Sequence, residues 1–145
     1  MSEATLEDQR KVPAPPDALQ EALGATGARE FDAAAGTARL HYRVKPDFCH
    51  TGGIAQGGFV TGWMDAAMAH AVMARLGAEA GSIWIATLEL KVSFLSAARQ
   101  DTEVIAEGRI IKQGRSVVFL EASLFGPDDA LIATSSSTVK LVKLR

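Results

Sequence analysis

Residues 57 to 76 form the most strongly apolar segment of the chain. Only Asp65, His70 and Arg75 interrupt it with titratable side chains, and apolar residues occur on nearly every side of a helix drawn through it. A helix without an extended polar face belongs in the interior of a protein. The pattern therefore predicts one central helix over residues 57 to 76.

After this segment the period of the apolar residues changes to two, as in a strand with one buried face. In the first strand, which begins at Ile83, one face is predicted to carry Trp84, Ala86, Leu88, Leu90, Val92 and Phe94, and the other face Thr87, Glu89, Lys91 and Ser93. Further strands are predicted at 102–112, 116–125 and 131–142, separated by the turn sequences KQGR and GPDDA. Short turns join antiparallel strands, so the central helix is expected to cover the apolar face of an antiparallel meander.

Smaller elements are predicted before the central helix. Residues 17–24, DALQEALG, combine an Asp at the cap position, helical apolar spacing and a closing Gly, which indicates a short helix. Residues 29–44 alternate on either side of Gly36, which indicates two strands joined by a tight turn. The expected fold class is α+β, an antiparallel sheet wrapped around a long central apolar helix.

Composition and charge limit the size of the core and the partners that the protein can have. With 145 residues, 48% of them hydrophobic, the chain can build one sizeable core. A net charge of -2 lacks the basic excess that binding to a phosphate backbone requires, so no nucleic-acid partner is expected. No membrane association is expected either, because Asp65 in the middle of a membrane span would cost about 2.5 to 3.5 kcal/mol.

The cysteine count and the N-terminal sequence suggest a compartment. Cys49 is the only cysteine, which excludes an internal disulfide and a cysteine zinc cluster and favours a reducing environment. The first residues, MSEATLEDQRKVPAPP, lack the basic and apolar regions of a signal peptide. We therefore predict a flexible N-terminal arm over residues 1–16, a single domain over residues 17–145, and a cytoplasmic location.

The glycine-rich entry to the central helix is a candidate site. Gly57 and Gly58 stand where the first backbone amides of a helix have no intrahelical partner and the helix dipole is positive, which favours an oxygen with developing negative charge. Glycine also allows such an oxygen to approach closely. A tight turn packed on a sheet would explain the glycines equally well, but the acid-bearing apolar helix that follows favours a site.

Asp65 is the candidate acid. Thr61, Gly62 and Ala69 lie one turn away from it, so its helical face carries small side chains that leave room for a substrate. Burial raises the pKa of a carboxyl group while nearby dipoles and hydrogen bonds lower it, a balance that enzymes use to keep an acid competent as base or nucleophile. The alternative is a core Asp hydrogen-bonded to a backbone group.

These stretches together resemble one known family. HTGGIAQGG (residues 50–58), then Asp65, TLELKVSFLSAA and GRIIKQGRSVVFLEASL are similar to the PaaI-like hotdog-fold acyl-CoA thioesterases of the phenylacetate-pathway type, over about residues 20–142. That family usually shows N-x-x-G-x-x-H-G-G, an acid on the following helix, and a strand like T-x-E-L-x-V-x-F-L-x-P-A. The chain departs from this pattern with His50 in place of Asn and Gln56 in place of His, and it has Ala69 where some relatives carry a hydroxyl.

The resemblance implies a hotdog fold and hydrolysis of an acyl- or aryl-CoA thioester to the free acid and CoA. Asp65 would be the base or nucleophile, the Gly57 amide the oxyanion donor, and His50 the group that positions water or polarises the carbonyl. No metal and no separate cofactor are expected, since coenzyme A enters as part of the substrate. Substrate contacts are predicted for Gln56, Gly58, Thr61, Ala69, Lys112 and Arg115.

Four of these assignments have open alternatives. His50 either positions water or the carbonyl, or only stabilises its loop. Gln56 either hydrogen-bonds within its turn or contacts the thioester oxygen. Lys112 and Arg115 flank the KQGR turn, where they would either meet the phosphates of CoA or form an ordinary exposed hairpin.

Helix geometry predicts a shared site. Gly57 and Asp65 are eight residues apart, which places them about 12 Å apart along a helix axis. One chain cannot bring both to a single carbonyl, so we expect a homodimer with two shared active sites, or a dimer of dimers.

Two other functions are known for proteins with this arrangement of elements. A non-catalytic acyl-CoA binding or sensing module of the hotdog superfamily remains the alternative to an enzyme. An enoyl-CoA hydratase is disfavoured, because His70 lies about 140° around the helix from Asp65.

Overall fold

The computed structural model describes residues 17–144, and the arm predicted for residues 1–16 lies outside them. Its main elements are the helices α2 (Ala18–Ala22) and α3 (Gly57–Leu76) and the strands β1 (Ala25–Asp32), β2 (Thr37–Arg43), β3 (Cys49–His50), β4 (Ile54–Ala55), β5 (Ile83–Phe94), β6 (Glu103–Gln113), β7 (Val117–Phe125) and β8 (Leu131–Lys143). Short 3-10 turns lie at Pro46–Phe48, Gly77–Ser82 and Pro127–Asp129.

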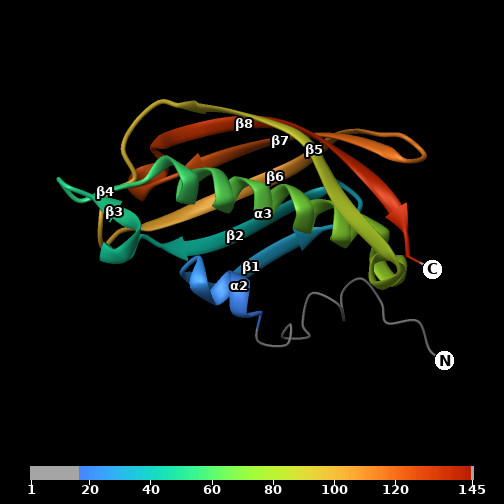
Figure 1. Cartoon of the computed structure of the whole chain (residues 1–145), viewed down its shortest axis with the longest axis horizontal. Helices are drawn as coiled ribbons and strands as arrows, with labels where there is room; N and C mark the ends of the chain where they lie inside the picture. Colours follow the sequence, from blue (N-terminus) through green and yellow to red (C-terminus); the bar gives the residue numbers. More distant parts are fainter. Residues whose placement is uncertain (1–16, 145) are drawn as a thin grey trace.

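Six strands form one antiparallel sheet in the order β1-β2-β6-β7-β8-β5. Figure 1 shows α3 lying along one face of this sheet, with β1 and β2 on one side of the helix and β7 and β8 on the other. The predicted fold class is confirmed: an antiparallel sheet wraps around a long central helix. The strands at the two edges are β1 and β5.

The core lies between α3 and the sheet. Trp63, Met64 and Met68 of α3 are completely or almost completely buried. Helix and sheet approach most closely at Gly108 of β6, where an added Cβ would collide with the backbone of Ala67. Glycine is required at this position because the backbones themselves are in contact.

The first half of the domain follows the prediction closely. Asp17 caps α2 by accepting hydrogen bonds from the amides of Leu19 and Gln20, so the capping signal was interpreted correctly. The strands β1 and β2 are joined by a turn that ends at Gly36, whose φ of 70° suits glycine. The small β3–β4 hairpin was not predicted, since strands of two residues carry no readable period.

The strand β5 departs from the predicted alternation at Leu88. Thr87 pairs with Val139 and Glu89 pairs with Thr138, so Leu88 is an extra residue in β5, a β-bulge. A shift of one residue moves all later side chains to the other face of a strand. Every second residue of β5 therefore does not stay on the same face across the bulge, as an unbroken alternation would predict.

The bulge corrects two expectations about β5. Trp84 and Leu88 are 60% and 57% exposed and do not share the helix-facing side with Leu90 and Val92. Thr87, expected on the outer face with Lys91, instead turns toward α3. Both errors have the same cause, because the sequence period alone does not reveal an inserted residue.

Between residues 17 and 144, no helix is both long enough and apolar enough to cross a membrane.

Candidate functional site

The N-terminus of α3 is organised by Gln56. This residue is the N-cap, and its side-chain oxygen accepts a hydrogen bond from the Gly58 amide at 2.8 Å. Of the two roles considered for Gln56, the turn hydrogen bond is the one present. It occupies the Gly58 amide, whereas the Gly57 amide has no acceptor within residues 17–144.

The first residue of α3, Gly57, lies next to an aromatic ring. A Cβ added at Gly57 would lie 3.0 Å from Cζ of Phe94, the last residue of β5. The ring therefore contacts the backbone at the first residue of α3. A free amide at the positive end of a 20-residue helix is a suitable donor for an oxyanion.

Asp65 lies in the middle of α3 and faces the edge strand β5. Its carboxylate is half-buried, and Oδ1 accepts a hydrogen bond from the Thr87 hydroxyl at 3.3 Å. The partner is a side chain on a strand, so the alternative of a core Asp bonded to the backbone is not the arrangement observed.

His70 lies on the opposite side of α3 from Asp65. Its ring stacks on Phe31 of β1, and Nδ1 donates to the Ala66 carbonyl at 2.7 Å. Burial lowers the pKa of His70, and the nearby Arg29 guanidinium adds to this effect. Asp65 and His70 thus face different edges of the sheet, as the helical angle predicts.

His50 stands at the end of β3, outside α3. The ring is exposed, and Nδ1 donates to the Thr51 carbonyl at 2.9 Å, which leaves Nε2 as the acceptor. The neighbouring Cys49 is a half-buried thiol whose pKa is raised by burial and by the Asp101 carboxylate. A thiol with a raised pKa is poorly suited to act as a nucleophile.

Thr61 and Ala69 are half-buried on either side of Asp65 along α3. The Thr61 hydroxyl donates to the Gly57 carbonyl at 2.8 Å, so it stabilises the first turn of the helix. The structure keeps small side chains along this face, as expected, but it brings neither residue to the Gly57 amide.

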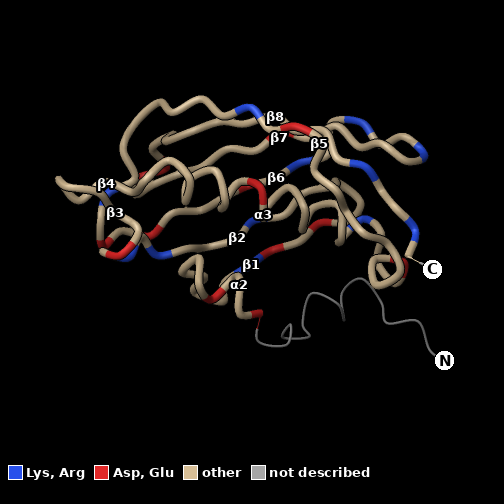
Figure 2. The backbone as a smooth tube through the Cα atoms, viewed as in Figure 1, with Lys and Arg blue, Asp and Glu red and all other residues tan. Residues whose placement is uncertain are grey.

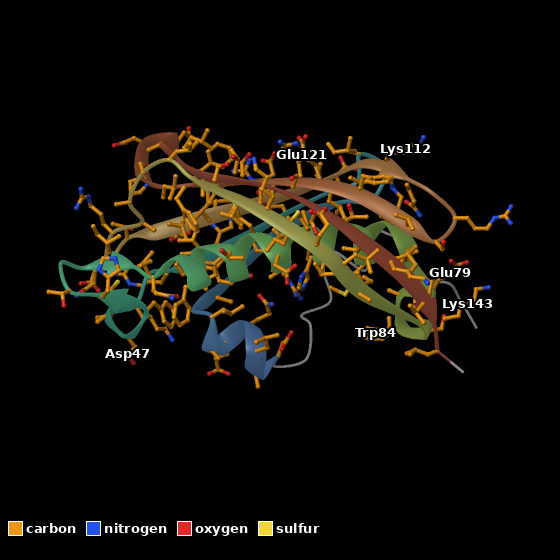
Figure 3. All side chains as sticks on the ribbon, turned by 45° about the horizontal axis from the view of Figure 1, so that its top comes forward. Asp47, Glu79, Trp84, Lys112, Glu121 and Lys143 are labelled. Atoms are coloured by element: carbon orange, nitrogen blue, oxygen red, sulfur yellow. The ribbon has the colours of Figure 1, made fainter. Side chains whose placement is uncertain are left out.

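Lys112 and Arg115 are exposed at the β6–β7 hairpin, away from the start of α3 (Figure 1). Lys140 and Lys143 of β8 lie at the same end of the molecule, where Figure 2 shows several basic residues close together. Figure 3 places Trp84 and Lys143 near each other at this end. Within one chain these cations are remote from Gly57.

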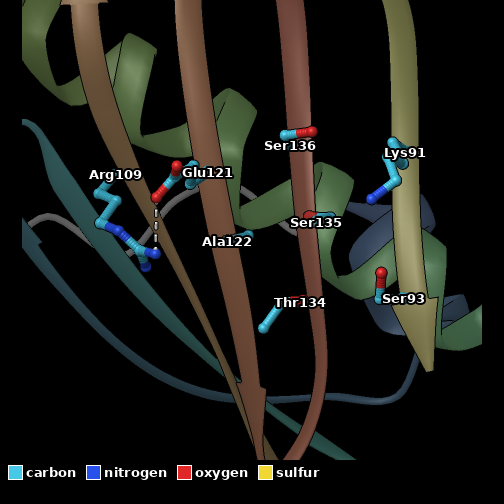
Figure 4. Close-up of a pocket in the computed structure, with 8 residues that line it drawn as sticks. All are labelled: Lys91, Ser93, Arg109, Glu121, Ala122, Thr134, Ser135 and Ser136. Atoms are coloured by element: carbon cyan, nitrogen blue, oxygen red, sulfur yellow. Dashed lines mark hydrogen bonds and ion pairs between the residues drawn. The ribbon is translucent and has the colours of Figure 1, made fainter. Parts of the chain in front are cut away.

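A polar hollow of about 290 Å³ lies elsewhere, on the face of the sheet that α3 does not cover (Figure 4). Lys91, Arg109 and Glu121 stand around it, and Arg109 forms an ion pair with Glu121 at 3.0 Å. Hydroxyl side chains of β5 and β8 complete the lining. None of the predicted site residues lines this hollow.

Sequence reasoning missed two residues beside the predicted site, Thr87 and Phe94. Both belong to the family-like stretch TLELKVSFLSAA, but the predicted alternation assigned Thr87 to the outer face and Phe94 only to the core. The contacts with Asp65 and Gly57 join positions 22 and 37 residues apart, and no local signal shows them. No group of three or more potential metal-ligating side chains is found in the described part of the chain.

Comparison with known proteins identifies the family. The model of the Thioesterase superfamily matches residues 52–133, more than half of the chain. A phenylacetic acid degradation-related protein from Ralstonia eutropha JMP134 is 27% identical, with a TM-score of 0.79 over 93% of this chain and 98% of that chain. No curated protein matches the sequence.

Two further solved structures share the fold at lower identity. The PaaI protein from the phenylacetic acid degradation operon of E. coli is 15% identical, with a TM-score of 0.78 over 99% of this chain and 100% of that chain. A hypothetical thioesterase with coenzyme A from Streptococcus pneumoniae TIGR4 is 16% identical, with a TM-score of 0.69 over 81% of this chain and 88% of that chain. The chain thus belongs to the thioesterase superfamily and has the hotdog fold of its PaaI-like members.

Proposed function

We propose that this protein is an acyl-CoA thioesterase that hydrolyses an acyl- or aryl-CoA thioester to the free acid and CoA. The observation that carries the proposal is a pair of groups on α3. Among the residues that the structure describes, the Gly57 amide has no acceptor at the start of the helix, and the Asp65 carboxylate is half-buried toward the edge strand β5. A thioesterase requires these two functions, an oxyanion donor and a base or nucleophile.

The reaction can use Asp65 in two ways. As a general base, the carboxylate takes a proton from water while the water oxygen attacks the carbonyl carbon, and the C–S bond then breaks to release CoA as a thiol after protonation. As a nucleophile, the carboxylate attacks the carbonyl carbon itself, releases CoA, and leaves an anhydride that water hydrolyses. In both routes the Gly57 amide stabilises the negative oxygen, with His50 positioning the water or the carbonyl.

A homodimer with shared sites accounts for the separation of these groups. Eight residues of helix separate Gly57 from Asp65 by about 12 Å along the axis, which is too far for one carbonyl. Antiparallel pairing of two β5 strands across a two-fold axis would bring the Gly57 end of one chain toward the middle of the partner's helix. The exposed apolar side chains of Trp84 and Leu88 support β5 as the pairing edge.

The same dimer also gives Lys112 and Arg115 of the β6–β7 hairpin a role in substrate binding. In such a dimer the hairpin end of one chain lies near the start of the partner's α3, so Lys112 and Arg115 reach the phosphates of CoA bound there. The S. pneumoniae relative described with coenzyme A is consistent with a CoA ester as substrate. Arg115→Ala should then raise KM for CoA esters while hardly changing KM for a pantetheine thioester, which lacks the nucleotide.

The function is tested by release of free thiol from a panel of acyl-CoA esters, followed with a thiol-reactive dye. Wild type should release CoA, and Asp65→Asn should not, while both bind a non-hydrolysable acyl-CoA analogue. Tight binding without turnover by wild type would instead identify a binding or sensing module.

The shared site has its own test. A heterodimer of Asp65→Asn and His50→Ala chains carries both lesions in one site and none in the other. If each homodimer is inactive, co-expression should restore activity in proportion to the heterodimer formed. A purified, folded heterodimer without activity would overturn the shared-site model.

A further inference from the structure

We propose that Phe94 forms the wall of the acyl site beside the oxyanion donor and thereby sets how much branching next to the thioester the enzyme accepts. This inference rests on the proposed thioesterase function and assigns a role within that site. It starts from the contact between the Phe94 ring and the first residue of α3.

The position of Phe94 in the sheet directs its side chain toward the helix. Phe94 pairs with Ala133, which is completely buried on the helix-facing side of β8. Residues opposite each other in an antiparallel pair point to the same face. The ring of Phe94 accordingly reaches Gly57, where an added Cβ would be 3.0 Å from Cζ and 3.3 Å from Cε1.

The ring is held on one side only. Phe94 is 57% exposed, although it contacts Gly57 and follows the inward-facing Val92 in β5. Within one chain, the Phe94 ring has one face against Gly57 and is otherwise uncovered. This is the arrangement of a side chain that lines a site and not of a core residue. The space beside it is bounded by the amide that would receive the thioester oxygen.

Two consequences follow for a bound thioester. With its oxygen on the Gly57 amide, the first carbon of the acyl chain lies close to the ring, so a branch at that carbon competes with Phe94 for space. A straight chain at that carbon avoids the ring, so the contact should discriminate between straight and branched acyl groups.

Butyryl-CoA and isobutyryl-CoA test the wall directly, because they have the same atoms and differ only in branching beside the carbonyl. Phe94→Ala should raise the ratio of kcat/KM for isobutyryl-CoA over butyryl-CoA by about tenfold, the lower end of what one methylene group contributes in an apolar pocket. Phe94→Leu should give an intermediate ratio. Leu95→Ala is the matched control, since Leu95 is the next residue and is 58% exposed.

A ratio of two substrates is insensitive to the amount of folded enzyme, so a merely structural role of Phe94 would leave it unchanged. The same ratio in Phe94→Ala and wild type, or an equal change in Leu95→Ala, would overturn the inference. Circular dichroism and size-exclusion chromatography of each variant check the fold and the assembly.

A double-mutant cycle gives a second, independent measurement. Gly57→Ala places a methyl group against the Phe94 ring. The loss of kcat that it causes should be at least about threefold larger in the wild-type background than in the Phe94→Ala background, because residues in contact are coupled. If the losses of kcat in the two single variants simply add up in the double variant, the Phe94 ring does not act at Gly57. Failure of the proposed function is distinct from both outcomes, because wild type itself would then release no CoA from any ester.

Discussion

Both edge strands of the sheet carry a register irregularity, but they differ in length and in exposed apolar surface. The strand β1 has eight residues and no large exposed apolar side chain. The strand β5 has 12 residues and exposes Trp84 and Leu88. A long apolar edge strand is a template for pairing with another chain.

The helix α3 also has one side that faces β5 and another that faces β1. Asp65 faces β5 through its hydrogen bond to Thr87, whereas His70 faces β1 through its stacking on Phe31. The edge that exposes apolar side chains is therefore also the edge that the candidate acid faces. Under the proposed function, chemistry and assembly would share the β5 side of the domain and the β1 side would serve stability, and four experiments test this difference.

The largest effect is expected at Asp65. Asp65→Asn keeps the shape of the side chain but removes its basicity, and it should lower kcat by at least about 100-fold, the usual scale for a general base. Steady-state thiol release with a CoA ester measures the loss. His70→Gln, on the β1 side of the same helix, is the control and should turn over substrate at close to the wild-type rate. Equal losses in the two variants would remove the distinction between the two sides.

A charge on the β5 edge should weaken assembly. Leu88→Lys places an ammonium group on each of two paired edges, and like charges that meet in an interface cost several kcal/mol. Sedimentation velocity should show a shift from dimer to monomer, with activity lost in parallel. Ala28→Lys, an exposed position of β1, should change neither property. An unaltered sedimentation profile for Leu88→Lys would place the interface elsewhere.

A smaller effect is expected from the hydrogen bond between Thr87 and Asp65. Thr87→Val removes the hydroxyl and keeps the shape, and it should lower kcat about fivefold, in line with a hydrogen bond of about 1 kcal/mol. Thr87→Ser should recover most of the activity. A Ser variant as impaired as the Val variant would show that restoring the hydroxyl does not restore activity, which contradicts a role for the hydrogen bond.

The smallest effect concerns stability on the β1 side. Burial lowers the pKa of His70, with the Arg29 charge acting in the same direction and the Ala66 carbonyl and Asp17 opposing it. The unfolded chain, with a histidine pKa of about 6.5, then binds a proton more readily than the folded one. The contribution of neutral His70 to stability is complete above the pKa of the unfolded chain, and it is lost as the pH falls from there through the lower pKa of the folded chain.

Urea unfolding at pH 7.5 and pH 5.5 measures this contribution. Wild type should lose more free energy of unfolding between the two pH values than His70→Gln, which has no group to titrate at this position. If the two proteins show the same difference, His70 is not the group responsible.

The sequence by itself determined the secondary structure around the site. The apolar segment predicted the central helix at the bounds that α3 has, and the turn sequences separated the strands of the meander correctly. It also singled out Gly57 and Asp65, because glycines before an acid-bearing apolar helix are a local pattern. Such local signals depend on residues close together in the chain, which is why they can be read without a structure.

Only the tertiary structure decided how β5 meets the helix. The bulge at Leu88 arises from the register between β5 and β8, and it turns Thr87 toward Asp65 although the alternation assigned it to the outer face. The contact of Phe94 with Gly57 likewise depends on where the end of β5 packs. Gln56 had two possible partners in the sequence, and the geometry of the helix entry selected the Gly58 amide. Each of these results depends on the packing of segments against one another, and a residue's neighbours in space are not encoded by the period of its own strand or helix.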